Sequence, residues 1–308
     1  MAKPRLLNTH SKKWESYKLF LYVLPCLIFI FIFKYLPLWG WSYAFFQYKP
    51  GRSLFDCAFV GLQNFTALFG NPIMRDNLLR VLRNTFGIQL LNYLLMPVPM
   101  LFAIFLSEIK STNFQKAVQT LTTLPHFISW VIMFSLATSL FGNSGVVNSV
   151  LARFGAEGIN ILTTNSHVWL IQALLGLWKS LGWSAIIYFA AITGLDQEVY
   201  EAAMVDGASR WQKIRYITIP LLIPTFFVLL IMGIGNFLNS GIDQFLAFGN
   251  AMNKEYIEVL DLYVYNLGIG NGQISFSVAV GMMKSLVAVV LFACANFASK
   301  KIRGTSVF

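Results

Sequence analysis

The stretch PLLIPTFFVLLIMGIGNFLNS (residues 220–240) contains no charged side chain and is long enough to cross a lipid bilayer as one helix. The hydrocarbon core of a bilayer requires about 20 mostly apolar residues per helix. The composition of the 308-residue chain agrees, because 56% of its residues are hydrophobic, only 12% are charged and the mean hydropathy is +0.62. Soluble domains usually contain about 25% charged residues. We therefore predict an all-α integral membrane protein.

Five further stretches have the same apolar character. The predicted membrane spans are about 17–37, 84–107, 117–141, 168–192, 220–240 and 276–299. Proline lies inside several of them, which membrane helices tolerate better than soluble helices do. The first apolar run is too long for a signal peptide, and no small-residue cleavage site follows it. No internal repeat is visible, so the sequence does not indicate a duplicated transporter in one chain.

Lysine and arginine are divided unequally between the two sides of the membrane. If the N-terminus is inside, thirteen lie on the cytoplasmic side and seven on the other, and an excess of this kind marks the cytoplasm. We therefore expect a cytoplasmic tail over 1–16, a six-span domain over 17–299 and a basic cytoplasmic tail over 300–308. The segments 38–83 and 241–275 are then external, and the loop 194–220 is cytoplasmic.

The basic stretch RDNLLRVLR (residues 75–83) conflicts with this distribution because it falls on the outer side. Its leucines and valine favour a short interfacial helix before the second span. A solvated loop end explains it equally well. Turn signals at 49–51 and at Asn71-Pro72 suggest that the chain reverses direction nearby.

Several kinds of site are excluded by the residues available. The three cysteines and three histidines are scattered, so neither a disulfide framework nor a metal site is predicted. No P-loop of the form GxxxxGK[ST] is present, so the chain is not predicted to hydrolyse ATP or to bind a cofactor itself. The net charge of +10 reflects basic residues that set the orientation in the membrane, so we do not predict a nucleic acid as partner.

The loop 194–220 contains the clearest helix start and stop signals among the polar segments of the chain. Asp196 is placed to cap a helix over 197–205, and Gly207 is placed to end it in a left-handed conformation. The stretch from Ser209 to Gln212 matches a capping box that starts a second helix, which we expect Pro220 to end at the membrane surface. Two short helices held between two spans favour a docking element over a catalytic one.

The residues EAAMVDGA (201–208), followed by ITIP (217–220), resemble the EAA motif of the membrane subunits of binding-protein-dependent ABC importers. Every defined position matches except that Ile219 replaces leucine. The resemblance implies a type I ABC importer permease fold and a loop that docks in a cleft of a cytoplasmic ATPase. The coupling residues it implies are Glu201, Ala202, Ala203, Asp206, Gly207, Ala208, Ile217 and Pro220.

A narrower resemblance is carried by LPHFISW (124–130), WKSLGW (178–183), YEAA (200–203) and the basic C-terminus. These segments are similar to carbohydrate permeases of the maltose-transporter type. Among those permeases, they most resemble the polysaccharide or alginate branch. This implies a non-enzymatic subunit of the cytoplasmic membrane that imports a carbohydrate. The implied partners are a second permease, which the resemblance favours as a different chain, two ATPase subunits that bind ATP and magnesium, and an extracytoplasmic solute-binding protein.

Polar and aromatic residues of the last three spans are candidates for the substrate pathway: Trp178, Lys179, Trp183, Tyr188, Asn236, Asn239, Gln244 and Lys284. The two lysines either attract an acidic sugar or make snorkelling or interhelical contacts, and we favour the second. We also favour a neutral or mixed oligosaccharide over an acidic one, although no carboxylate within the spans is expected to neutralise these lysines. The aromatic residues either stack on sugar rings or lie at the membrane–water interface. The amides contact either the ligand or other helices. For His126 we favour a structural role.

A self-sufficient secondary transporter or channel for a small polar solute is the alternative function. It would favour carboxylates inside the spans or an inverted repeat, and neither is visible. A helix-turn-helix DNA reader is excluded, because a short loop between two spans leaves no room for its supporting domain.

Overall fold

The computed structural model describes residues 9–159, 161–162 and 167–303. The outer parts of the predicted tails, 1–8 and 304–308, lie outside the described residues. The described chain is helical and has no β-strand, apart from an isolated antiparallel bridge between Phe46 and Phe59. Six helical stretches within it are long and apolar enough to cross a membrane, as predicted: Tyr17–Phe45, Pro72–Ser107, Trp130–Arg153, Val168–Thr193, Arg210–Gly235 and Ile274–Lys301.

Some spans are single α-helices, such as α8 and α15, and others include π-helical or 3₁₀ turns, which carry η labels. In chain order the first half contains α1 (Thr9–Ile30), η1 (Phe31–Tyr35), η2 (Leu36–Phe45), η3 (Leu54–Asp56), α2 (Gln63–Gly70), α3 (Pro72–Leu95), α4 (Pro97–Ser107), α5 (Thr112–Thr123), η4 (Leu124–Phe127), α6 (Trp130–Phe141) and α7 (Val146–Arg153). The second half contains α8 (Val168–Thr193), α9 (Gln197–Val205), α10 (Arg210–Lys213), η5 (Ile214–Thr218), α11 (Ile219–Gly235), α12 (Asp243–Phe248), α13 (Lys254–Ile257), α14 (Leu260–Tyr265), η6 (Asn266–Gly270) and α15 (Ile274–Arg303).

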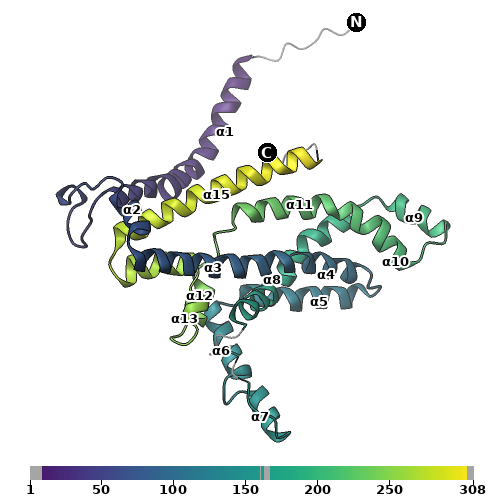
Figure 1. Cartoon of the computed structure of the whole chain (residues 1–308). Helices are drawn as coiled ribbons and strands as arrows, with labels where there is room; N and C mark the ends of the chain where they lie inside the picture. Colours follow the sequence, from purple (N-terminus) through teal and green to yellow (C-terminus); the bar gives the residue numbers. More distant parts are fainter. Residues whose placement is uncertain (1–8, 160, 163–166, 304–308) are drawn as a thin grey trace.

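The long helices α3, α4, α8, α11 and α15 form the body of the molecule, with α4 and α3 packed on α8 and α11 packed on α15 (Figure 1). The hairpin of α9 and α10 lies at one end of these helices, and α2 lies at the other. Helix α1 leaves the body at an angle, and its apolar surface is exposed. Helices α6 and α7 project away from the body.

The second span begins earlier than predicted, and the solvated-loop reading of 75–83 is wrong. Asn71 is the N-cap of α3 and accepts hydrogen bonds from the amides of Ile73 (3.0 Å) and Met74 (3.4 Å), so Asn71-Pro72 starts α3, and the chain bends at Asn71 between α2 and α3, as the turn signal predicted. The stretch 75–83 is the first part of this continuous helix. Its Arg80 pairs with Glu258 at 2.6 Å, and the Glu258 side chain is only 4% exposed.

The third predicted span, 117–141, is interrupted, and its bounds are wrong, because the stretch that is long and apolar enough to cross a membrane is Trp130–Arg153. Pro125 lies in the 3₁₀ turn η4, and the chain is extended at Ile128 and Ser129 before α6 begins. Proline has no N–H to donate, and its ring clashes with the carbonyl four residues earlier. Ser129 restarts the helix by accepting a hydrogen bond from the amide of Ile132 at 3.3 Å. The first span is longer than predicted, because the helix continues beyond residue 37 through η2 to Phe45.

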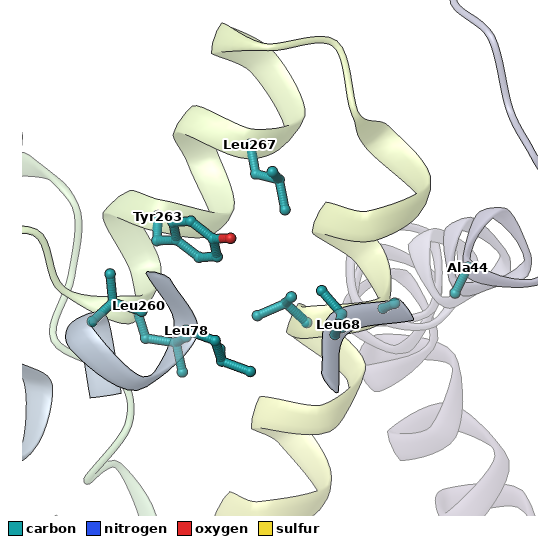
Figure 2. Close-up of a cluster of buried hydrophobic side chains, with 9 residues drawn as sticks. Ala44, Leu68, Leu78, Leu260, Tyr263 and Leu267 are labelled. Carbon is teal, nitrogen blue, oxygen red and sulfur yellow. The ribbon is translucent and has the colours of Figure 1, made fainter. Parts of the chain in front are cut away.

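Three clusters of buried apolar side chains hold the helices together. One of them joins η2, α2, α3, α14, η6 and α15 at the end opposite the α9–α10 hairpin; Figure 2 shows it. Its Leu68, Val81 and Ala279 have no exposed surface. Burial, followed by the nearby Glu258 carboxylate, raises the pKa of Tyr263 above its usual value, so this phenol stays neutral in the cluster. The second cluster joins α3, α6, α8 and α12–α14, and the third joins α4, α8 and α11.

Candidate functional site

The loop 194–220 folds as the sequence predicts in its first half. The Asp196 carboxylate accepts a hydrogen bond from the amide of Glu198 at 2.9 Å and begins α9. Gly207 ends that helix with φ +78°. The amide of Gly207 donates to the carbonyl of Met204 (3.1 Å), and that of Ala208 donates to the carbonyl of Ala203 (2.9 Å). This pair of bonds is the Schellman arrangement, which fixes the direction in which the chain leaves the helix.

The second half of the loop begins as predicted and ends differently. The Ser209 hydroxyl accepts from the amide of Gln212 (3.3 Å) and the Gln212 side chain accepts from the amide of Ser209 (2.7 Å), so the capping box is present. The prediction that Pro220 ends this helix is wrong. The chain continues through the π-helical turn η5 into α11, and Pro220 lies in the first turn of α11. The wider π turn accommodates a residue that lacks an N–H and crowds the preceding turn.

One side-chain bond fixes the hairpin to the span that follows it. The Tyr200 hydroxyl lies 2.9 Å from the Thr218 hydroxyl, and so α9 is tied to η5. The position of α9 is therefore linked to the turn from which α11 begins. This contact cannot be read from either residue alone in the sequence.

The residues of the EAA motif lie on the outside of the molecule. Glu201, Ala202, Asp206, Gly207 and Pro220 are exposed, and Ala203, Ala208 and Ile217 are half-buried. Apolar side chains of the same loop are also exposed: Met204, Val205, Trp211 and Tyr216. The hairpin therefore presents exposed charged groups beside exposed apolar side chains. This composition is typical of a docking surface.

A cavity of about 520 Å³ lies between the spans, where α3 gives way to α4 and where α8 and α11 face that break. Its wall consists of Asn92, Leu95, Met96, Pro99, Gly176, Leu177, Ser180, Trp183, Ser184, Ile187, Tyr188 and Leu229. The lining combines aromatic rings, hydroxyls and one amide with apolar side chains, and none of its members is charged. Such a wall can form hydrogen bonds with a polar neutral group and pack against an apolar face.

Two of the eight predicted pathway residues, Trp183 and Tyr188, line this cavity. Tyr188 is 2% exposed, and its hydroxyl has no hydrogen-bond partner within the described residues. Trp178, on the same helix, is exposed and is absent from the wall.

The two intramembrane lysines are occupied by protein contacts, as we favoured. Lys179 donates to the backbone carbonyls of Pro125 (3.1 Å), His126 (2.7 Å) and Ile128. Lys284 forms an ion pair with Asp261 of α14. The expectation that Lys284 lacks a neutralising carboxylate is therefore wrong, because Asp261 reaches it from the segment 241–275.

The three predicted amides have different surroundings. Gln244 donates to the carbonyl and side-chain oxygens of Gln172, both at 2.8 Å, and joins α12 to α8. Asn239 donates to the side chain of Asn236 at 3.2 Å. Asn236 lines a separate cavity of about 370 Å³ between α11 and α15, and donates to the carbonyl of Met232 at 3.2 Å.

Sequence reasoning missed the polar residues that α3 contributes. Asn92 of the cavity donates to Gln89 (3.2 Å), and Gln89 donates to Ser240 (3.1 Å), so a chain of polar groups leads away from the wall. Two signals were available. Gln89 and Asn92 are polar residues three apart in an apolar span, and Gly176, Ser180 and Ser184 are small residues at every fourth position of α8.

Comparison with known proteins agrees with this architecture. Residues 95–304 match the family described as "Binding-protein-dependent transport system inner membrane component". The permease YteP of the polygalacturonan/rhamnogalacturonan transport system of Bacillus subtilis (strain 168) is 40% identical over 285 residues, covering 92% of this chain and 88% of YteP. The arabinooligosaccharide permease AraP of the same organism is 28% identical over 286 residues, covering 92% and 87%.

Solved structures give the same result. A bacterial ABC transporter involved in the import of the acidic polysaccharide alginate contains a chain with a TM-score of 0.83 and 32% identity, covering 96% of this chain and 99% of that one. A second structure shows a bacterial alginate ABC transporter in complex with a periplasmic protein that holds an alginate pentasaccharide, with a TM-score of 0.83, 32% identity and coverage of 98% and 100%. The chain has the all-α, six-span permease fold, and it belongs to the family of binding-protein-dependent transport system inner membrane components.

Proposed function

We propose that this chain is one permease subunit of an ATP-driven importer that carries an oligo- or polysaccharide across the cytoplasmic membrane. The observation that carries the proposal is the exposed hairpin 194–220, whose cap, left-handed glycine and Tyr200–Thr218 bond hold it rigidly between α8 and α11. Such an element can pass a displacement from a docked partner to two spans at once. A binding-protein-dependent family and relatives that are sugar permeases support the same function.

The partners follow from this role. Two ATPase subunits, which bind ATP and magnesium, dock on the hairpin through Glu201, Asp206 and the neighbouring small residues. A second permease, a different chain, completes the pathway, and a solute-binding protein delivers the sugar from outside. An alginate importer similar to this chain has been solved with its periplasmic protein, which supports that last partner. Both termini face the cytoplasm, as the lysine and arginine distribution favours.

The substrate is recognised by hydroxyls and apolar ring faces. The 520 Å³ cavity offers Asn92, Ser180 and Ser184 for hydrogen bonds and Trp183 for stacking, with no charged side chain in its wall. Lys179 and Lys284 do not favour an acidic sugar, because they are held by backbone carbonyls and by Asp261. The wall that this chain contributes is therefore polar and uncharged.

Reconstitution tests the function. Proteoliposomes with the permease pair, the ATPases and the binding protein are expected to accumulate labelled sugar from a panel of galacturonate, alginate and arabinose oligosaccharides only when ATP is supplied. An ATPase with its P-loop lysine replaced is the matched control and should abolish uptake. Uptake by this chain alone, down an ion gradient, would instead support a self-sufficient secondary transporter.

A further inference from the structure

The two segments that carry the narrower family resemblance, 124–130 and 178–183, meet in the structure. The first contains the break between α5 and α6, and the second is the middle of α8. Helix α8 packs against both α5 and η4. Three independent contacts join them, and each depends on one residue of α8: Lys179, Gly182 or Trp183. These residues are three and four positions apart and share one face of the helix.

The first two contacts fix the backbone of the break. A broken helix leaves carbonyl oxygens without partners, and in a membrane each must be satisfied within the protein. The Lys179 ammonium accomplishes this for His126 and Ile128, and it shares the Pro125 carbonyl with the amide of Ile128 (3.2 Å). It lies 5.5 Å from the centre of the Trp130 ring. Gly182 lets α8 approach closely, since a Cβ there would lie 2.4 Å from the carbonyl carbon of Thr122. The break therefore has a fixed position on α8.

The third contact reaches the cavity. The imidazole of His126 stacks on the indole of Trp183 with the ring centres 4.4 Å apart and the planes at 2°. Phe127 meets the same indole edge-on at 5.9 Å. One face of the indole is thus covered by the break, and Trp183 also lines the 520 Å³ cavity. These contacts restrict the indole on that face, while 47% of the Trp183 surface remains exposed.

We propose that His126 is a positioning residue that holds the Trp183 indole in the cavity wall as a platform for a sugar ring. The apolar face of a sugar packs on an aromatic face, and a platform that is already ordered binds it with less loss of conformational entropy. The sugar part of this inference rests on the proposed function. The position of the indole does not, and the test separates the two.

The first arm uses no sugar. Ser180→Cys, one turn before Trp183 on the cavity wall, is introduced into a chain whose native cysteines are replaced by serine, and its reaction rate with a small maleimide is measured. Helical side chains lean toward the N-terminus of their helix, so a released indole covers position 180. We expect His126→Ala to slow the reaction several-fold and His126→Phe, which keeps a flat ring, to leave it unchanged.

The control variant for this arm is Phe134→Ala, which removes an aromatic contact with Phe248 at 5.2 Å outside the cavity wall and should leave the rate unchanged. An unchanged or faster reaction in His126→Ala overturns the positioning role. Equal slowing in His126→Ala and His126→Phe overturns it as well, because stacking would then not be the cause.

The second arm measures sugar transported per ATP hydrolysed in the reconstituted complex, with alginate and galacturonate oligosaccharides as probes. His126→Ala is expected to lower this ratio between about two- and tenfold, the effect of one aromatic contact. In a Trp183→Leu background it should have no further effect, since His126 acts through Trp183; an equal further loss there overturns the inference. Absence of uptake by the unaltered complex contradicts the proposed function, while the first arm still decides the position of the indole.

Discussion

At the scale of single residues, the ion pair between Lys284 and Asp261 shows how an intramembrane charge is accommodated. Lys284 lies in α15, and its side chain is only 14% exposed; the Asp261 side chain is 15% exposed. Asp261 also accepts a hydrogen bond from the amide of Gly241 at 3.1 Å. The pair therefore joins α15, α14 and the segment that follows α11. Removing one member leaves the other charge buried without a partner.

This arrangement makes a prediction about stability. Lys284→Met or Asp261→Leu alone is expected to lower the free energy of unfolding by about 3–5 kcal/mol, the usual penalty for an unpaired buried charge. The double variant should recover most of that loss, because no uncompensated charge remains. Melting of the purified protein in detergent measures the effect, with exposed Lys116→Met as the control. Additive losses in the double variant would show that the two residues act independently.

At the scale of helices, the caps were predictable and the pairings were not. Asp196, Gly207 and Ser209 specify helix ends through bonds to residues two to five positions away, so their roles are legible in the sequence. The bond between Tyr200 and Thr218 and the contacts of Lys179 join residues far apart along the chain. Their partners are selected by packing, which a local pattern does not encode.

Proline shows the limit of local rules within the spans. Pro125 interrupts the predicted third span, whereas Pro220 lies in a continuous helix and Pro72 begins one. The same missing N–H leads to a break, a π turn or a helix start, depending on what satisfies the neighbouring carbonyls. At Pro125 the carbonyl accepts hydrogen bonds from the amide of Ile128 and from the Lys179 ammonium, which another helix supplies. Six spans were therefore predictable from apolar length, but their internal breaks were not.

At the scale of the whole molecule, orientation is the property on which the proposed mechanism depends. The hairpin 194–220 must face the cytoplasm for an ATPase to reach it. We expect Asn113→Cys, in the segment between α4 and the break, to react with a membrane-impermeant thiol reagent only from the cytoplasmic side. Met252→Cys, whose parent side chain is 69% exposed, should react only from outside.

Both cysteines are placed in a chain that lacks Cys26, Cys57 and Cys294, of which the first and last are exposed and would react themselves. Labelling is compared in intact cells and in inverted vesicles. Reaction of both cysteines from one side would rule out the six-span topology, and the reversed pattern would place the hairpin outside.

The proposed transport mechanism also accounts for why the spans are tightly packed and the hairpin 194–220 is exposed. Buried clusters join the spans along the body, while the hairpin projects from one end with its motif exposed. Closure of docked ATPases would displace this hairpin, and its connection to α8 and α11 would move two walls of the cavity together. The pathway then alternates between two arrangements of packed helices, which is the usual repertoire of switching proteins.

The most direct test of the account is ATPase docking by a glycine variant with a matched control. Gly207 and Gly241 both have φ +78°, and a Cβ at either position meets nothing within 4 Å. A valine at each therefore introduces the same left-handed strain, roughly 1–2 kcal/mol, but only Gly207 sets the geometry of the hairpin. The amount of ATPase that co-purifies with each variant is measured at equal expression and equal melting temperature. We predict that Gly207→Val loses most of the ATPase while Gly241→Val retains it; wild-type recovery with Gly207→Val, or equal loss in both, would contradict the account.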